Sequence, residues 1–195
     1  MITEKRQQKI EQIVKNRQSG LIVVLENIHD PHNAAAILRS CDAFGIKDVY
    51  FVFETVEPYN PKKVGKVSSS SANKWLDFQT FRTSKDCFDQ LKKDGYEIVV
   101  TILDEQAQSI NEIDLINDKL ALVISNEHAG VSEYAAKNAT KKMYVPMQGM
   151  VQSFNVSVTA GICLYELNRQ RLQSGNDYSL TKKEQAKLIK DYCER

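Results

Sequence analysis

Residues 143–158, MYVPMQGMVQSFNVSV, combine a short apolar run with a Pro/Gly loop and two polar side chains. The run Met143–Val145 is typical of a strand, and Ser153 and Asn155 stand where the next helix should begin. A strand–loop–helix junction of an α/β protein presents free backbone N–H groups at the carboxyl end of the sheet, where ligands usually bind. The segment therefore predicts a ligand-binding loop, although Ser153 and Asn155 would also serve as ordinary helix caps.

A second candidate lies upstream in residues 21–45, LIVVLENIHDPHNAAAILRSCDAFG. Its apolar run Leu21–Leu25 predicts a strand buried on both faces, and Asp30 can cap the helix that follows, with Gly45 just past its end. Three- and four-residue spacing places several side chains on one helix face: His32, Ala35, Ala36 and Arg39. The small alanines would let a ligand or another backbone approach Arg39, although a helical arginine is also commonly a solvated surface residue.

Three segments, in their order along the chain, resemble the SPOUT family of RNA methyltransferases, and within it the TrmH branch of ribose 2′-O-methylases. They are LENIHDPHNAAAILR (25–39), ALVISNEHAGVSE (121–133) and VPMQGMVQSFNVSVTAG (145–161). The resemblance covers about residues 5–172. The runs ENIHDPHN, GMVQSFNVSV and LYELNRQR (164–171) are similar to the subgroup that methylates the D-loop guanosine of tRNA at position 18.

This resemblance implies an α/β fold with a mostly parallel sheet, helices on both faces, a C-terminal deep trefoil knot and helical extensions at both ends. It also implies an enzyme that uses S-adenosyl-L-methionine, releases S-adenosyl-L-homocysteine, needs no metal and methylates a ribose in tRNA. The family works as a homodimer, in which Arg39 of one subunit is expected near the cofactor of the other. The small residues Ser157, Ala160 and Gly161 would permit close helix contact there.

The same resemblance assigns catalytic roles to five residues: Arg39, Asn33, Glu127, Ser153 and Asn155. Loops of the knot would bind the cofactor, largely through backbone groups, and the residues carried over are Thr101, Leu103, Asn126, Glu127, Gly130, Val145, Met147, Gly149, Ser153 and Val156. Their apolar members would form the walls of a pocket while their amides provide polar contacts. Glu127 and Asn155 also have simpler explanations, as a loop residue near a helix start and as a helix cap.

Arg39 matches the residue to which the family assigns activation of the ribose hydroxyl. A guanidinium is a poor base because it stays protonated. Either an RNA phosphate takes the proton through Arg39, or Arg39 stays charged, positions that phosphate and stabilises the developing alkoxide, which is the interpretation we favour. Asn33 lies about 9 Å along the helix axis and about 120° around it from Arg39. We therefore expect Asn33 to hold the helix start or a neighbouring loop.

Composition agrees with a cytosolic enzyme without deciding its function. No apolar stretch approaches the roughly 20 residues that cross a bilayer, and the single, scattered cysteines argue against a zinc site or a disulfide framework. The net charge of +1 is unevenly distributed: residues 1–20 carry five Lys/Arg against two Glu, and residues 161–195 carry seven against five acids. These basic ends, and the cluster Lys62, Lys63, Lys66 and Lys74, would contact RNA phosphates, or they are simply solvated helix faces.

Alternating patterns predict a parallel sheet covered by helices. Strands are expected at 21–25, 48–53, 74–79, 96–102, 119–124 and 142–145. Helices are expected at 5–17, 31–44, 84–93, 132–139, 155–172 and 181–193. Residues 173–179, QSGNDYS, read as a linker. We therefore divide the chain into an N-terminal helical extension (1–20), a methyltransferase domain (21–172) and a C-terminal extension (173–195).

Two other functions remain open. One is a related 2′-O-methylase that acts on ribosomal RNA or on the wobble nucleotide of tRNA. The other is a non-catalytic RNA-binding module with the same fold, although binding alone would not require Arg39, Glu127, Ser153 and Asn155 together. The chain departs from the family pattern at Ser125, often Gly, at Phe154, often Leu, and in NEHA (126–129), where relatives tend to have a basic residue.

Overall fold

The structure is a computed structural model that describes residues 2–64, 72–126 and 130–195. Its centre is a sheet of seven strands in the order β3-β2-β1-β6-β4-β7-β5, with every neighbouring pair parallel. The strands are β1 (Leu21–Glu26), β2 (Asp48–Val52), β3 (Asp77–Phe81), β4 (Glu97–Thr101), β5 (Gln108–Ser109), β6 (Leu120–Ser125) and β7 (Lys141–Tyr144). The α-helices are α1 (Glu4–Lys15), α2 (Pro31–Ala43), α3 (Ser84–Lys93), α4 (Glu133–Asn138), α5 (Val156–Ser174) and α6 (Lys182–Glu194).

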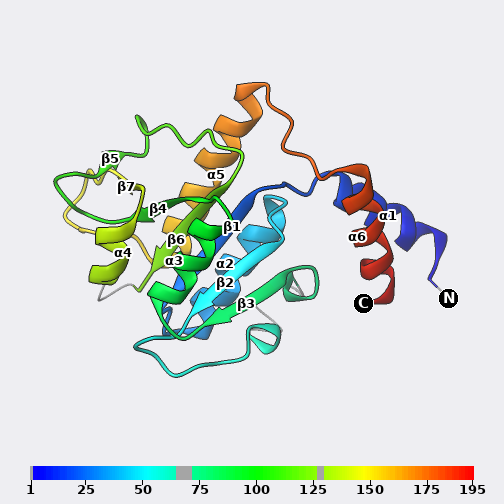
Figure 1. Ribbon diagram of the computed structural model, residues 1–195, viewed down its shortest axis with the longest axis horizontal. Helices are drawn as coiled ribbons and strands as arrows, with labels where there is room; N and C mark the ends of the chain where they lie inside the picture. Colours follow the sequence, from blue (N-terminus) through cyan, green and yellow to red (C-terminus); the bar gives the residue numbers. More distant parts are fainter. Residues whose placement is uncertain (1, 65–71, 127–129) are drawn as a thin grey trace.

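Both faces of the sheet are covered, as the sequence predicts (Figure 1). Successive side chains of a strand point to opposite faces, so Leu21, Val23 and Leu25 of β1 pack in the cluster formed with α2 and α5. Ile22 and Val24 face the other cluster, which includes the apolar side chains of α3 and α4. This double burial explains why β1 and β6 read as unbroken apolar runs.

The predicted elements are confirmed, although many of their bounds shift by one or two residues, and α1 ends at Lys15 where residue 17 was expected. Three further differences have a physical reason. The third strand is not 74–79 but Asp77–Phe81, because Ala72–Lys74 form a 3-10 helix whose first carbonyl accepts from the N–H of Trp75. Strand β5 was not predicted, since two residues are too few to show a period. Helix α5 continues to Ser174, into the predicted linker, and stops at Gly175, whose φ of +75° suits glycine.

The start and end of α2 follow the predicted signals. The carboxylate of Asp30 accepts from the N–H of His32 (2.8 Å), and Pro31 occupies the first turn. Gly45 follows the helix at φ +75°, and a Cβ there would lie 2.3 Å from the carbonyl oxygen of Asn16. Glycine is therefore required both by its backbone conformation and by its packing against the end of α1.

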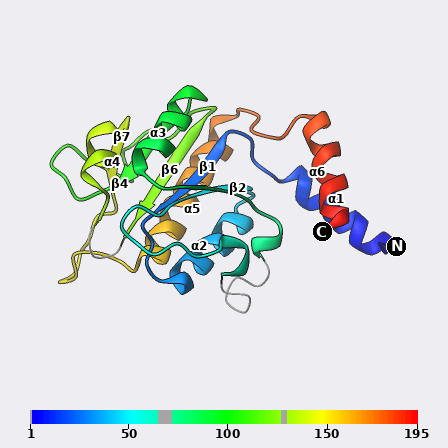
Figure 2. The ribbon, with the colours of Figure 1, turned by 60° about the horizontal axis from the view of Figure 1, so that its bottom comes forward.

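Helices α1 and α6 lie side by side, apart from the sheet, with both chain termini near them (Figures 1 and 2). They share a small hydrophobic cluster of their own that contains Ile10, Val14, Leu188 and Tyr192. None of the helices in the described part of the chain is long and apolar enough to cross a membrane.

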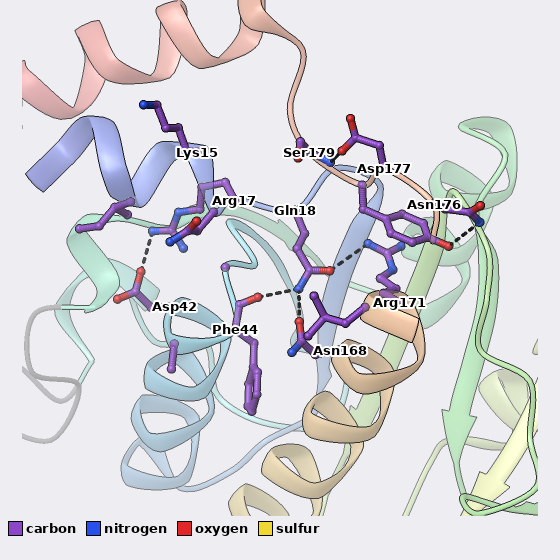
Figure 3. A pocket seen from close by; sticks show the side chains of 16 residues that line it. Lys15, Arg17, Gln18, Asp42, Phe44, Asn168, Arg171, Asn176, Asp177 and Ser179 are labelled. Carbon is purple, nitrogen blue, oxygen red and sulfur yellow. Dashed lines mark hydrogen bonds and ion pairs between the residues drawn. The ribbon is translucent and has the colours of Figure 1, made fainter. Parts of the chain in front are cut away.

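Buried arginines join this helical pair and the end of α5 to the sheet domain (Figure 3). Arg17 donates to the carboxylate of Asp42 (2.6 Å) and to the carbonyls of Ile46 and Trp75 (both 3.2 Å). Arg171, 3% exposed, donates to the side chain of Gln18 and to backbone carbonyls of residues 19, 20 and 117. Its guanidinium also lies 4.1 Å from the ring centroid of Tyr178. One side chain therefore holds three separate backbone segments together.

We expect Arg171→Ala to lower the free energy of unfolding by about 3 kcal/mol, because it removes a buried guanidinium that donates to three partly buried backbone carbonyls and to Gln18. Denaturant unfolding followed by circular dichroism measures this. The matched control is Arg169→Ala on the same helix, where a partly exposed ion pair to Glu166 (2.6 Å) should contribute less than about 1 kcal/mol. Equal losses for the two variants would contradict the structural role of Arg171.

Candidate functional site

A cavity lies where β4 and β7 end and α5 begins. Residues from three segments line it: Thr101, Ile102 and Leu103; Met143, Tyr144, Val145 and Met147; Gln152, Ser153, Phe154 and Thr159. Its volume is about 110 Å³, and exposed Leu103 and Phe154 extend its apolar wall toward solvent. The cavity combines apolar walls with hydroxyl groups and loop backbone at the carboxyl edge of a parallel sheet, the position that α/β proteins use for ligands.

Half of the predicted cofactor residues meet in this cavity: Thr101, Leu103, Val145, Met147 and Ser153. Two others do not line it. The side-chain amide of Asn126 donates to the carbonyl of Asn27 (2.9 Å), and the N–H of Gly130 donates to the carbonyl of Asn126 (3.0 Å). Both follow β6, which lies next to β4, so they belong to the same edge of the sheet.

The remaining predicted residues of this set lie elsewhere. Gly149 is exposed in the loop before α5, and Val156 is buried in the core cluster under that helix. Glu127 lies outside the described residues. Conversely, Met143, Tyr144, Gln152 and Thr159 line the cavity without having been predicted as site residues. Their only sequence signal is that each lies within a few residues of a predicted one.

Asn33 and Asn155, separated by 122 positions in sequence, touch at the N-terminal ends of α2 and α5. The amide nitrogen of Asn155 donates to the side-chain oxygen of Asn33 (3.1 Å). Asn155 also caps α5, since its side-chain oxygen accepts from the N–H of Ser157 (2.9 Å). Asn155 therefore caps α5 and also contacts Asn33, which is another predicted catalytic residue. Asn33 is not the cap of α2, which is Asp30.

Arg39 is exposed on α2 and makes no hydrogen bond or ion pair with the described residues. The cavity lining does not include it. Of the alanines expected beside it, Ala34 and Ala35 are buried in the core, and only Ala36 shares the partly exposed face. Within one chain, Arg39 is thus held at the surface by a rigid helix with its guanidinium available to an outside partner.

The N-terminal region of α5 and the loop before it expose a group of large apolar side chains. Met150 is 100% exposed, Val151 63% and Val158 47%, and Tyr165 and Leu172 continue the exposed row along the helix. Gly161 has open space where a Cβ would be, whereas Ala160 is buried against the chain's own core. The expectation that Ala160 lies at a helix–helix contact between subunits is therefore not supported, while Ser157 and Gly161 remain accessible.

No cysteine is among the described residues that line this cavity. Cys41, Cys87 and Cys163 are buried in α2, α3 and α5. Burial raises the pKa of Cys163 to about 12 and that of Cys87 to about 12, with the negative charge of Glu26 adding to the shift of Cys87. These thiols stay protonated at neutral pH and pack as small apolar groups.

The two roles of Asn155, as the cap of α5 and as the partner of Asn33, can be separated by mutation. Asn155→Ala should lower stability by about 1 kcal/mol through the lost cap and should also impair the activity of the site. Asn155→Ser restores a capping oxygen but is too short to reach Asn33. We expect the serine variant to recover the melting temperature and not the activity. Recovery of both would mean that the contact with Asn33 has no function.

Comparison with known proteins identifies similar chains. A model described as the SpoU rRNA Methylase family matches residues 20–165. The tRNA (guanosine(18)-2′-O)-methyltransferase of Thermus thermophilus is 38% identical over 173 residues, which cover 89% of this chain and 87% of that protein. These matches confirm the resemblance that the three motifs predict.

Solved structures agree. The TrmH/SpoU tRNA modifying enzyme of A. aeolicus has a TM-score of 0.85 at 32% identity, covering 98% of this chain and 96% of that chain. The SpoU methyltransferase AviRb from Streptomyces viridochromogenes, in complex with the cofactor AdoMet, has a TM-score of 0.69 at 26% identity, covering 83% of this chain and 64% of that chain. The arrangement of helices around the parallel sheet is therefore shared with these proteins.

Proposed function

The chain belongs to the SpoU rRNA Methylase family, and from this premise we propose that it methylates the 2′-hydroxyl of the guanosine at position 18 of tRNA. The single observation that carries the proposal is the convergence of Thr101, Val145 and Ser153, from three distant segments, on one cavity at the carboxyl edge of the sheet. The Thermus thermophilus enzyme is 38% identical to this chain in an alignment that covers 89% of it, and this similarity supports the choice of tRNA.

The residues of the cavity fit S-adenosylmethionine chemically. Leu103, Met147 and Phe154 offer apolar contact to a purine, and the loops after β4 and β7 offer backbone groups. Because the cavity of about 110 Å³ is smaller than the roughly 300 Å³ of a typical ligand pocket, a bound cofactor would extend over the exposed rim. When bound, the cofactor supplies an electrophilic methyl group, and the chain has to align the ribose hydroxyl and manage its proton.

Arg39 is the proposed group for that task. It stays charged, positions an RNA phosphate through its planar fork and stabilises the developing alkoxide. Asn33 and Asn155 hold the starts of α2 and α5 together, and Glu127 and Ser153 complete the proposed catalytic set. Asn126 and Gly130, at the neighbouring strand end, complete the proposed cofactor contacts with Gly149 and Val156.

We propose a homodimer, because Arg39 lies at the surface and outside the cavity of its own chain. The exposed apolar side chains of the loop before α5 and of α5 itself suit burial against a second copy. In that dimer Arg39 of one subunit would serve the cavity of the other. A monodisperse monomer that is fully active in sedimentation and activity measurements at the same concentration would disprove this.

The remaining expectations are proposed on the same basis. The chain after residue 138 inserts β7 between β4 and the earlier β5, an order that supports a C-terminal trefoil knot. Residues 1–20 and 173–195 would be extensions of a 21–172 domain, with exposed Lys5, Arg6 and Lys9 of α1 and Lys183 and Lys187 of α6 contacting tRNA phosphates. A tRNA-modifying enzyme of this kind would work in the cytoplasm.

Ribosomal RNA is the second candidate substrate, because the matching SpoU rRNA Methylase family is named for it.

The test is to incubate the protein with labelled S-adenosylmethionine and unmodified tRNA or ribosomal RNA transcripts, and to map alkali-resistant nucleotides. We expect one resistant position, guanosine 18 of tRNA, which disappears when this base is replaced. Label in ribosomal RNA alone would favour the second candidate. No label in any RNA and no binding of S-adenosylmethionine would leave a non-catalytic module.

A further inference from the structure

Glu26 is a buried carboxylate that the proposed mechanism leaves unexplained. It is the last residue of the central strand β1, it is 0% exposed, and no arginine, lysine or histidine among the described residues forms an ion pair with it. A buried charged or polar group loses its hydration, which costs free energy. The hydrogen bonds that Glu26 accepts must therefore offset this loss.

Three serines from three elements supply those hydrogen bonds. The hydroxyls of Ser84, at the start of α3, and of Ser132, the cap of α4, donate to Oε1 (2.5 and 2.7 Å). The hydroxyl of Ser125, at the end of β6, and the N–H of Ser132 lie 2.9 and 3.0 Å from Oε2. Glu26 therefore ties the strand end of β1 to both ends of the connection between β6 and α4.

Two of the proposed cofactor residues that follow β6, Asn126 and Gly130, lie in the described part of that connection. The hydroxyl of Ser125 lies 2.7 Å from the carbonyl of Gly130 as well as next to Glu26. The side chain of Asn126 donates to the carbonyl of Asn27, the residue that follows Glu26. Asn27 has a left-handed backbone (φ +53°), and its side-chain oxygen accepts from the N–H groups of residues 54 and 55, so this contact point is itself fixed.

We propose that Glu26 is a positioning residue: through Ser125 and Ser132 it holds the proposed cofactor residues Asn126 and Gly130 in the geometry that binds S-adenosylmethionine. The inference rests on the proposed function. Ligand-binding groups need a supporting shell that holds them to within about 0.5 Å, and the hydrogen bonds that the buried Glu26 carboxylate accepts from the serines provide such a shell. Ser84 connects the same carboxylate to α3, which carries no proposed cofactor residue.

The two serines give a matched test. Ser125→Ala and Ser84→Ala each remove one hydroxyl from Glu26, but only Ser125 also contacts Gly130. We expect Glu26→Gln and Ser125→Ala to raise the KM and the calorimetric Kd for S-adenosylmethionine about tenfold, with kcat changed less than about threefold. Ser84→Ala should leave the KM within about twofold of the unaltered chain. The affinity for tRNA should stay constant in all three, and thermal unfolding reports their stability.

The outcomes separate the hypotheses. If the unaltered chain methylates tRNA and Glu26→Gln keeps its KM for S-adenosylmethionine, the positioning role is wrong and the proposed function stands. If Ser84→Ala raises the KM as much as Ser125→Ala, in proportion to lost stability, Glu26 acts on folding alone and the inference is overturned. If the unaltered chain neither binds S-adenosylmethionine nor methylates RNA, the proposed function fails and this inference fails with it.

Discussion

Arg39→Ala is expected to lower methyl transfer to tRNA by about three orders of magnitude or more, to the limit of detection. The reason is that the variant loses the charged donor proposed to stabilise the developing alkoxide, a type of interaction whose removal commonly costs about 10²–10³ in rate. Because Arg39 is proposed to act on an RNA phosphate and the ribose hydroxyl and not on the cofactor, the affinity for S-adenosylmethionine measured by calorimetry should not change. Single-turnover methylation of a tRNA transcript measures the chemical step directly.

Arg39→Lys tests whether charge alone is enough. Lysine keeps the positive charge but loses the planar, two-pronged fork that holds a phosphate, so we expect at most a trace of activity. Lys93→Ala, which removes an exposed cation from α3 on the other face of the sheet, is the control and should be fully active. Near-normal activity of Arg39→Lys would rule out the proposed role of the fork.

Val158→Glu is expected to convert a dimer into monomers and to lower activity by about 100-fold or more. Val158 is exposed near the start of α5, within the apolar group proposed to face a second copy. A carboxylate buried at such a contact has no partner, and small misplacement of catalytic groups costs about 10²-fold in rate. Sedimentation velocity measures the oligomeric state, and the same sample is assayed for methyl transfer.

Lys93→Glu introduces the same charge on the opposite face and is the control, which should sediment and react as the unaltered chain does. A second measurement tests whether one active site combines the cavity of one subunit with Arg39 of the other. Mixing Arg39→Ala with Met147→Arg, which fills the cavity, should recover activity that neither variant has alone, since one subunit supplies the arginine and the other the cavity. A mixture as inactive as its parts would mean that each chain uses its own Arg39.

Local signals in the sequence predicted most of the elements correctly. Asp30, Pro31 and Gly45 delimit α2 through backbone chemistry that does not depend on the rest of the fold, and the β-branched runs of β1 and β6 report burial on both faces. The errors occur where tertiary contacts decide. Strand β5 exists because it pairs with β7, and the shift of β3 follows the 3-10 turn that precedes it.

For the site, the sequence by itself determined the family, through three ordered motifs, and the residue types available for chemistry. Only the tertiary structure decided which of them meet. The contact between Asn33 and Asn155, and the network around Glu26, join positions 58 to 122 residues apart, and periodicity carries no information on such pairs. Nor does a motif state that Arg39 is exposed and does not line the cavity of its own chain, because that depends on how a helix is rotated against the sheet.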